Sequence, residues 1–555
     1  MLTKGLYRPL VTSRLQSPYV ELGVSEFVKD IQSMKRTILF WTITAGLIGC
    51  MTASLKALED GISVFEDVPR LEPEEFPILP WGWTPGHLDG LKEIRACGFN
   101  LAGFVDPEAL DLVGEAGLKS IVVHSTTRVD ENDCRLDQTQ IDQRVAAFVQ
   151  QVGQHPAIFG YYLRDEPGSH FFPGLSKWVE AFRKAAPQAC AYINLFPNYA
   201  SSQQLNASTY EEYLESYIQT VRPHFISYDH YALMDDGSLR DGYFRNLEAV
   251  RDVAQRHGLP FWNTVLASAQ FRYAVPTEAG LRFQLYTTLA YGGRGISYFV
   301  YFATTIGNCR RAPIDQFGHK TPTWDMLRNV NLQLHRIGKV YLTLKSINVF
   351  HHPEVPHGCS GIKTSRWLTY VKGADLLVGE FEGPNGQPFV MVVNKSLHDS
   401  TSFHVTFKGP GKIEFINAYT GKTRDWGGEN TWLAPGQGML LCLGRSIDDH
   451  EPKTTAWVRT IINQTAESGP KQEWFTTEMW KVVESQKHVM QGTFKALGKL
   501  EALELLSREG PQQHRKSRYR VRFTHGSLII MMTIDQDGKI SYIESQAGYI
   551  ERETE

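Results

Sequence analysis

Three acidic residues have types and positions suited to proton transfer. Asp165-Glu166-Pro167 directly follows a short apolar run, and Asp229 stands in a second such run, within the sequence Tyr-Asp-His-Tyr. When two carboxyl groups face each other, the protonated one can donate to a leaving oxygen while the ionised one acts as nucleophile or base. This division of roles is what cleavage of a glycosidic bond requires. The neighbouring charge of Asp165 would raise the pKa of Glu166 and keep it protonated near neutral pH.

A repeating order of apolar runs and helical patterns must position these acids. Eight β-type runs precede residue 304: 76–83, 99–106, 118–125, 158–167, 190–197, 225–231, 260–268 and 295–303. The intervals leave room for helices, and Thr209 and Thr277 would supply N-cap hydroxyls to two of them. Eight β-then-α units predict an α/β fold, the (β/α)₈ or TIM barrel; a doubly wound sheet is the poorer alternative.

The active site of such a barrel lies where the strands end, so the candidate residues are those that close the eight runs. Asp165, Glu166 and Asp229 are the candidate catalytic residues. Aromatic faces and polar side chains suited to a sugar ring accompany them. The expected substrate-binding residues are Trp81, Trp83, His124, Arg164, Asn194, His230, Tyr231, Trp262, Tyr298 and Tyr301.

The tripeptide also carries a resemblance. Asp165-Glu166-Pro167 is similar to the Asn-Glu-Pro signature of clan A glycoside hydrolases, and a barrel followed by a β-sandwich resembles the family 42 layout. The resemblance covers roughly residues 76–445 and implies that Glu166 is the general acid/base. The chain departs from the pattern at strand 7, where the family has a nucleophilic glutamate and residues 265–270 contain no acid. Glu278 lies too far beyond the end of strand 7 to replace this nucleophile, and it suits the first turn of the next helix.

Asp229 is the best replacement for the missing carboxylate, and two assignments remain open. In the first, Glu166 is the acid and Asp229 the nucleophile or base. In the second, Asp165 is the nucleophile and Asp229 the acid, which resembles clan D α-galactosidases in strand position. We favour the first, because adjacent strand residues point to opposite sides and the clan A resemblance directs Glu166 toward the substrate.

The domain plan extends beyond the barrel, which we place at residues 76–345. Strands without intervening helices predict an antiparallel β-sandwich over 346–446, and a linker over 447–456 follows. Residues 457–555 predict a small α+β domain. Its runs 497–505, 519–523 and 535–540 resemble the NTF2-like domains appended to secreted hydrolases. A structural or interaction role is expected for both C-terminal parts.

The N-terminal region resembles an export signal. Basic residues Lys35 and Arg36 precede an apolar run over 37–52 that is short for a membrane span. Leu47-Ile-Gly-Cys50 resembles the lipobox of bacterial lipoproteins, which implies lipidation of Cys50. We therefore expect a leader over 1–53, a linker over 54–75, and export to the periplasm or cell envelope. An uncleaved anchor and an ordinary cleaved signal are the alternatives.

Composition excludes several other classes. The 555 residues are 42% hydrophobic, so a mostly disordered chain is excluded. A formal charge of −3 gives no electrostatic case for nucleic-acid binding. The seven cysteines include no CxxC pair. Asp106, His124, Asp229 and His230 lack the spacing of a metal site, so neither metal nor cofactor is expected.

These observations predict an exported glycoside hydrolase that acts on an oligo- or polysaccharide. We expect the protein to contact a membrane only through an N-terminal lipid or signal anchor. The missing strand-7 carboxylate keeps open a catalytically inactive, carbohydrate-binding barrel protein at the cell surface. A cell-surface scaffold whose terminal domain recruits a partner is a further alternative.

Overall fold

The computed structural model describes residues 75–304, 308–409, 411–426, 431–444, 449–511 and 514–550. Contacts divide the chain into the units Met1–Asp67 and Val68–Glu555, and every described residue belongs to the second. The expected leader with Cys50, and the linker up to residue 74, lie outside the described residues, so export and lipidation stay predictions. Within the described part, no helix combines the length and apolarity needed to cross a membrane.

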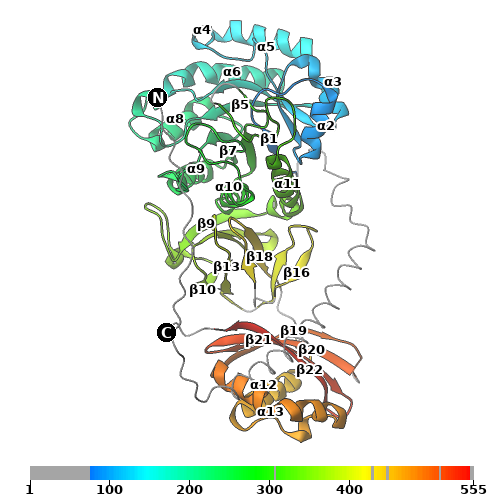
Figure 1. Cartoon of the computed structure of the whole chain (residues 1–555). Helices are drawn as coiled ribbons and strands as arrows, with labels where there is room; N and C mark the ends of the chain where they lie inside the picture. The colour runs from blue at the N-terminus through cyan, green and yellow to red at the C-terminus, as the bar shows by residue number, and fades with distance from the viewer. Residues whose placement is uncertain are drawn as a thin grey trace, which may run out of the picture. The chain divides into compact units, whose positions relative to one another are not determined.

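Eight parallel strands form the barrel, as predicted (Figure 1). Their order in the sheet is β1-β8-β7-β6-β5-β4-β3-β2. The strands are β1 (Ile78–Pro80), β2 (Leu101–Val105), β3 (Lys119–Val122), β4 (Ile158–Asp165), β5 (Cys190–Leu195), β6 (Ile226–Asp229), β7 (Phe261–Leu266) and β8 (Gly295–Phe299).

Helices occupy every interval between these strands and follow the last one. They are α2 (Leu88–Ala96), α3 (Leu110–Glu115), α4 (Glu131–Arg135), α5 (Gln138–Val152), α6 (Phe172–Ala185), α7 (Ser202–Leu205), α8 (Tyr210–Val221), α9 (Tyr243–Arg256), α10 (Glu278–Ala290) and α11 (Pro322–Tyr341), with 3₁₀ turns η1 (Pro107–Ala109) and η2 (Ser169–Phe171). The predicted N-caps are present: Thr209 accepts from the Glu212 amide and Thr277 from the Gly280 amide. The (β/α)₈ prediction is confirmed.

The barrel closes between β2 and the segment that follows β1. The Thr84 amide donates to the Phe104 carbonyl at 2.9 Å, and the Phe104 amide donates to the Gly82 carbonyl at 3.0 Å. Gly103 allows this approach, because a Cβ there would lie 2.5 Å from the Pro80 carbonyl oxygen and its φ is +89°.

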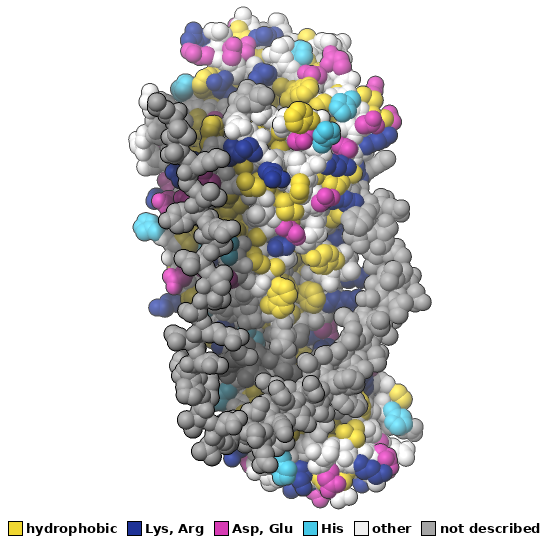
Figure 2. All heavy atoms as spheres, viewed as in Figure 1, with side chains coloured by type: hydrophobic (Ala, Val, Ile, Leu, Met, Phe, Trp, Pro, Cys, Tyr) yellow, Lys and Arg dark blue, Asp and Glu magenta, His cyan; other side chains and the backbone are white. Residues whose placement is uncertain are grey.

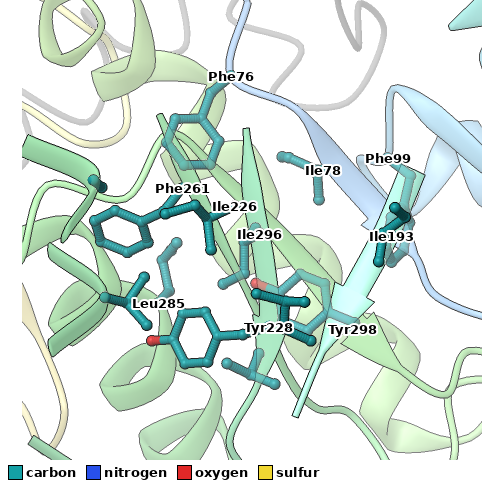
Figure 3. Packing of buried hydrophobic residues seen from close by; sticks show 14 of the residues in the cluster. Phe76, Ile78, Phe99, Ile193, Ile226, Tyr228, Phe261, Leu285, Ile296 and Tyr298 are labelled. Atoms are coloured by element: carbon teal, nitrogen blue, oxygen red, sulfur yellow. The ribbon is translucent and has the colours of Figure 1, made fainter. Parts of the chain in front are cut away.

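Two apolar layers follow from the alternation of strand side chains. One fills the barrel interior and includes Leu79, Leu101, Ile121, Tyr192 and Trp262. The other lies between strands and helices; Figure 3 shows part of it, with Phe99, Tyr228 and Tyr298 among its members. A side chain's layer therefore decides whether it can face the mouth of the barrel.

An antiparallel β-sandwich follows the barrel, as predicted. Its six-stranded sheet has the order β16-β15-β18-β12-β11-β9, and the pairs β10-β14 and β13-β17 accompany it. The elements are β9 (Lys345–His352), β10 (Leu368–Lys372), β11 (Leu376–Glu382), β12 (Pro388–Asn394), β13 (Thr401–Ser402), β14 (His404–Phe407), β15 (Ile413–Ile416), β16 (Thr423–Asp425), β17 (Trp432–Leu433) and β18 (Gly438–Leu443), with η3 (Ile362–Thr364) and η4 (Pro384–Gly386). Gly379 of β11 meets the α10 backbone closely, since a Cβ there would lie 2.1 Å from the Ala290 carbonyl oxygen.

The last part of the chain is the expected α+β unit. Its four-stranded sheet is a simple antiparallel meander, β19-β20-β21-β22. The elements are α12 (Pro452–Ser468), η5 (Gln472–Trp474), α13 (Thr477–Leu497), β19 (Leu500–Glu509), β20 (His514–Phe523), β21 (Gly526–Asp535) and β22 (Ile540–Ile550). The helices and sheet bury an apolar cluster of their own, separate from that of the barrel.

Positively and negatively charged side chains are intermixed on the face of the molecule that Figure 2 shows. This distribution agrees with the near-neutral formal charge of −3.

Candidate active site

The end of β4 carries an irregularity that changes which way its side chains point. Tyr162 pairs with Tyr192 of β5, but the next pair is Arg164 with Ile193, so Leu163 is skipped in the register. Leu163 is buried toward the helices. The extra residue reverses the alternation, and Asp165 therefore lies on the interior side together with Asn194, its partner in the register.

Glu166 then leaves the strand in a left-handed conformation, with φ at +43°. This is an uncommon backbone state for a residue with a side chain. Its amide donates to the Asn194 carbonyl at 2.8 Å, which fixes the turn. The Glu166 carboxyl group faces that of Asp229 on β6, close enough for each to shift the pKa of the other. Asp165 and Glu166 thus both reach the carboxyl cluster, whereas simple strand alternation predicts opposite sides.

Asn194 on β5 connects two of the three acids. Its Nδ2 donates to Asp165 Oδ1 at 3.2 Å and to Asp229 Oδ1 at 3.1 Å. Its Oδ1 accepts from Ser227 Oγ at 2.9 Å, and Ser227 Oγ lies 3.0 Å from the Tyr192 hydroxyl. Since the Ser227 proton is directed to Asn194, Tyr192 donates to Ser227. This chain of hydrogen bonds holds the amide with its donors facing the carboxylates.

Burial and mutual repulsion raise the pKa of each acid. Burial raises the pKa of Asp165 to about 6, against the Asn194 hydrogen bond and the charge of Arg164. Burial and then the charge of Asp165 raise the pKa of Glu166 to about 7, while the hydrogen bond with Asp229 lowers it. Burial, followed by the charges of Glu166 and Asp165, raises the pKa of Asp229 well above its ordinary value. The cluster therefore retains a proton near neutral pH.

His230 follows Asp229 and is held as a neutral ring. Its Nδ1 lies 3.0 Å from Asn246 Oδ1. The Asn246 Nδ2 atom donates to the Tyr210 hydroxyl at 3.2 Å, so Oδ1 must be the acceptor and His230 Nδ1 carries the proton. Burial lowers the pKa of His230 to about 4. Nε2 then presents a lone pair, and it has no hydrogen-bond partner among the described residues.

Aromatic side chains surround the carboxyl cluster at the mouth. Trp81 lies 5.0 Å from Phe104 and 5.4 Å from Phe299 between ring centroids. Tyr231 packs against Phe299 at 5.6 Å and Tyr273 at 5.5 Å. Burial, and then the charges of Asp229, Asp165 and Glu166, raise the pKa of Tyr231.

A cavity of about 500 Å³ opens beside this mouth, between the ends of β1 and β8. Trp81 and Trp83 both line it, and Trp83 is 61% exposed. An exposed indole next to a cavity is suited to stacking on a flat, apolar ring face.

Four of the expected substrate-binding residues lie away from the carboxyl cluster. Trp262 stands near the start of β7 and stacks on Phe225 at 4.4 Å, inside the barrel and below the mouth. Tyr298 and Tyr301 belong to the layer facing the helices, where they lie 5.9 Å and 5.4 Å from Phe99. His124 stacks on Phe148 of α5 at 4.9 Å.

Arg164 also points away from the barrel axis. Its Nη1 donates to the Val129 carbonyl at 2.6 Å, and its guanidinium lies 3.7 Å from the Phe171 ring centroid. Its effect on the site is electrostatic, because its charge lowers the pKa of Asp165. Among the expected binding residues, Asn194 thus hydrogen-bonds to two of the acids, and the charges of all three act on Tyr231.

The end of β7 contains no carboxylate, as the sequence indicated. Ser268 stands there, and its Oγ accepts from the Val300 amide at 3.2 Å. Glu278 begins α10 and forms an ion pair of 2.9 Å with Arg282. Among the described residues, no group of three or more His, Cys, Asp or Glu side chains is arranged to hold a metal ion.

Phe299, Tyr273 and Ser227 were not among the expected site residues. Phe299 follows from the position of Tyr298, since adjacent residues of β8 face opposite layers. The same alternation places Ser227 on the interior side, two residues before Asp229. Tyr273 lies in the loop after β7, where the sequence offers no periodicity.

Comparison with known proteins concerns the fold. No protein-family model and no curated protein matches the chain. A structure described as a glycoside hydrolase shares 11% identity over 68% of this chain and 97% of its own, with a TM-score of 0.45. A glycoside hydrolase family 5 protein from Bacteroides vulgatus shares 12% identity over 66% of this chain and 88% of its own, with a TM-score of 0.42. A β-galactosidase from the psychrophilic Marinomonas ef1 shares 10% identity over 48% of this chain and 62% of its own, with a TM-score of 0.38.

All three TM-scores are below 0.5, so the description of the fold rests on the strand order of this chain. The order of a parallel eight-stranded barrel followed by antiparallel sheets is the glycoside hydrolase layout that the sequence resemblance implied.

Proposed function

We propose that this chain hydrolyses O-glycosidic bonds of an oligo- or polysaccharide at the carboxyl ends of β4 and β6. The observation that carries the proposal is the cluster of Asp165, Glu166 and Asp229, which joins a carboxyl group protonated near neutrality to an ionised one. Glycosidic cleavage needs that combination.

Glu166 is the proton donor in this proposal. Its side chain is partly exposed, whereas Asp229 is 3% exposed and lies behind it. A pKa of about 7 leaves Glu166 half protonated at neutral pH, which suits an acid that must later act as a base. Asp229 assists by accepting or sharing the Glu166 proton.

Asp165 is the better candidate for the ionised carboxylate that faces the sugar. It accepts from Asn194, the charge of Arg164 favours its anion, and its pKa, at about 6, is below that of Glu166, at about 7. It is also more exposed than Asp229. This assignment differs from the one favoured from the sequence, in which Asp229 was the nucleophile or base, because the β4 irregularity directs Asp165 inward.

The Asp165 and Asp229 carboxylates lie close together, because both accept from the same nitrogen of Asn194, at 3.2 and 3.1 Å. In glycosidases the separation of the acid from the second carboxylate, here Glu166 from Asp165, decides between retention at about 5–5.5 Å and inversion at about 6.5–9.5 Å.

The test is a panel of 4-nitrophenyl glycosides with the full chain and four variants. Glu166→Gln should leave sugar binding nearly intact and lower kcat by several orders of magnitude on the corresponding phenyl glycosides. The loss should be smaller on the 4-nitrophenyl glycosides, whose activated leaving group needs little protonation. The matched control is Glu108→Gln, an exposed acid of η1, which should not change turnover. Unchanged hydrolysis by Glu166→Gln would refute the assignment.

Azide distinguishes the two carboxylates. In Asp165→Ala, azide can enter the vacated space, attack the anomeric carbon and form a glycosyl azide, which restores release of nitrophenol. The same rescue in Asp229→Ala and not in Asp165→Ala would return the nucleophile to Asp229.

The empty end of β7 favours a second candidate, a barrel that binds carbohydrate without cleaving it. Calorimetric binding of oligosaccharides with no product after prolonged incubation would support that function instead.

A further inference from the structure

One arginine at the rim of the site carries a charge that the protein does not neutralise. Arg240 lies in the loop between β6 and α9, on the same end of the barrel as Asp229. Its guanidinium carbon is 4.2 Å from the Tyr199 ring centroid and 5.3 Å from that of Tyr273. Its Nη2 donates to the Tyr273 hydroxyl at 3.0 Å. Within the described ranges, Arg240 forms no ion pair with an acid.

The contacts of Arg240 fix its position but leave one of its hydrogen-bond donors without a partner among the described residues. Its Nε is buried and has no hydrogen-bond partner in the part of the chain that the structure describes. A buried, unpaired donor on a charged group costs free energy. Elsewhere in the barrel, Arg282 meets the Glu278 carboxylate at 2.9 Å and Arg294 donates to three main-chain carbonyls. Arg240 is thus fixed in place by aromatic rings and retains donors for an external partner.

Two aromatic contacts connect Arg240 to the carboxyl cluster. The Tyr199 ring lies 5.0 Å from the ring of His230, the residue after Asp229. The Tyr273 ring lies 5.5 Å from that of Tyr231, whose pKa is raised by burial and by the charges of all three acids. Two aromatic side chains, Tyr273 and Tyr231, therefore separate the guanidinium from the acids, a placement suited to the far side of a bound sugar.

We propose that Arg240 is a specificity residue that binds the carboxylate of a uronic acid, so that the substrate is an acidic glycan. This inference rests on the proposed function and names its substrate class. The planar guanidinium fork matches a carboxylate in two parallel hydrogen bonds, a geometry that a neutral CH₂OH group cannot reproduce. The positive charge also offsets the repulsion that an anionic sugar meets from Asp165.

The test compares substrates that differ only at C6: 4-nitrophenyl glucuronide against glucoside, and galacturonide against galactoside, in both anomers. The wild-type chain should have a higher kcat/KM for the uronide of the accepted pair. Arg240→Gln should lower the uronide-to-neutral ratio about 10- to 100-fold, the effect of losing a charge-assisted hydrogen bond. Arg240→Lys, which keeps the charge and loses the fork, should give an intermediate ratio.

Arg272→Gln is the matched control. Arg272 lies on the same rim, but it is exposed and faces Asp235 at 3.7 Å and Asp236 at 3.6 Å, so its replacement should not change the ratio. An equal fall in Arg272→Gln and Arg240→Gln would indicate only a general charge effect and overturn the proposal. Thermal unfolding of each variant verifies that it folds.

Binding separates failure of this inference from failure of the proposed function. Calorimetry with Glu166→Gln should give tighter binding of glucuronate than of glucose, and Arg240→Gln in that background should abolish the difference. If neutral glycosides are cleaved and uronides are not, the hydrolase function stands and this inference falls. If nothing is cleaved but glucuronate binds through Arg240, the inference stands alone. Tighter binding of glucose 6-sulfate than of glucuronate would overturn the choice of a carboxylate.

Discussion

Glu166 should destabilise the folded barrel at neutral pH, and its replacement should therefore stabilise the protein. Its pKa rises from 4.5 to about 7 on folding. A carboxyl group whose pKa is raised in the folded state contributes stability that is fully present below the unfolded value and is lost as pH rises through the folded value. That rise corresponds to about 3 kcal/mol. Since the side chain is partly exposed, solvent screening should reduce it to about 1–2 kcal/mol.

Glu166→Gln removes this ionisation. Relative to wild type, the variant should gain about 1–2 kcal/mol between about pH 4 and pH 8, a rise in Tm of roughly 2–8 °C. Differential scanning calorimetry of the barrel transition at both pH values measures the change. Glu108→Gln is the control, because Glu108 is exposed in η1 and its replacement should have the same small effect at either pH. A Glu166→Gln variant that gains nothing, or loses stability, on going from pH 4 to pH 8 would refute the electrostatic reasoning.

Further predictions concern the supports of the fold and the site. Glu380 is fully buried in the sandwich and accepts four hydrogen bonds, so Glu380→Ala should cost about 3–5 kcal/mol in guanidinium unfolding; a loss below about 1 kcal/mol would contradict this role. Gly103→Ala should destabilise the barrel by more than about 1 kcal/mol in thermal unfolding, since its φ is +89° and the new Cβ would meet a carbonyl oxygen of β1; an unchanged Tm would argue against that closure. Asn194→Leu removes a donor to Asp165 and Asp229, so the pKa values of both should rise further in NMR titration of the carboxyl groups; a fall in either pKa would contradict this role.

Much of the barrel follows from the sequence, because its evidence is periodic. Eight apolar runs separated by helical intervals admit few arrangements, and Thr209 and Thr277 locate two helix starts through their hydroxyls. The sandwich was harder to predict in detail. The strand β9 begins at Lys345, where the sequence placed the end of the barrel, and β13 has only two residues. Elements this short or this close to a boundary give no usable alternation.

The site depends on features that alternation cannot reveal. The skipped residue Leu163 and the left-handed Glu166 together bring two consecutive acids to one cluster, and neither feature has a sequence signature. Depth along a strand matters equally: Trp262 faces the interior, but it stands near the start of β7 and cannot reach the mouth. Tyr298 is excluded by direction, since it faces the helices. Direction and depth must both be known before a strand residue is assigned to a site.

The pH dependence of kcat/KM on an accepted glycoside tests the central claim most directly. Glu166 must be protonated to donate, so the rate should fall as pH rises through about 7, the value to which burial and the charge of Asp165 raise its pKa. Asp165→Asn, measured on its residual activity, should move this fall to lower pH because the repelling charge is gone. A wild-type rate that stays constant or increases between about pH 6 and pH 9 would contradict the account.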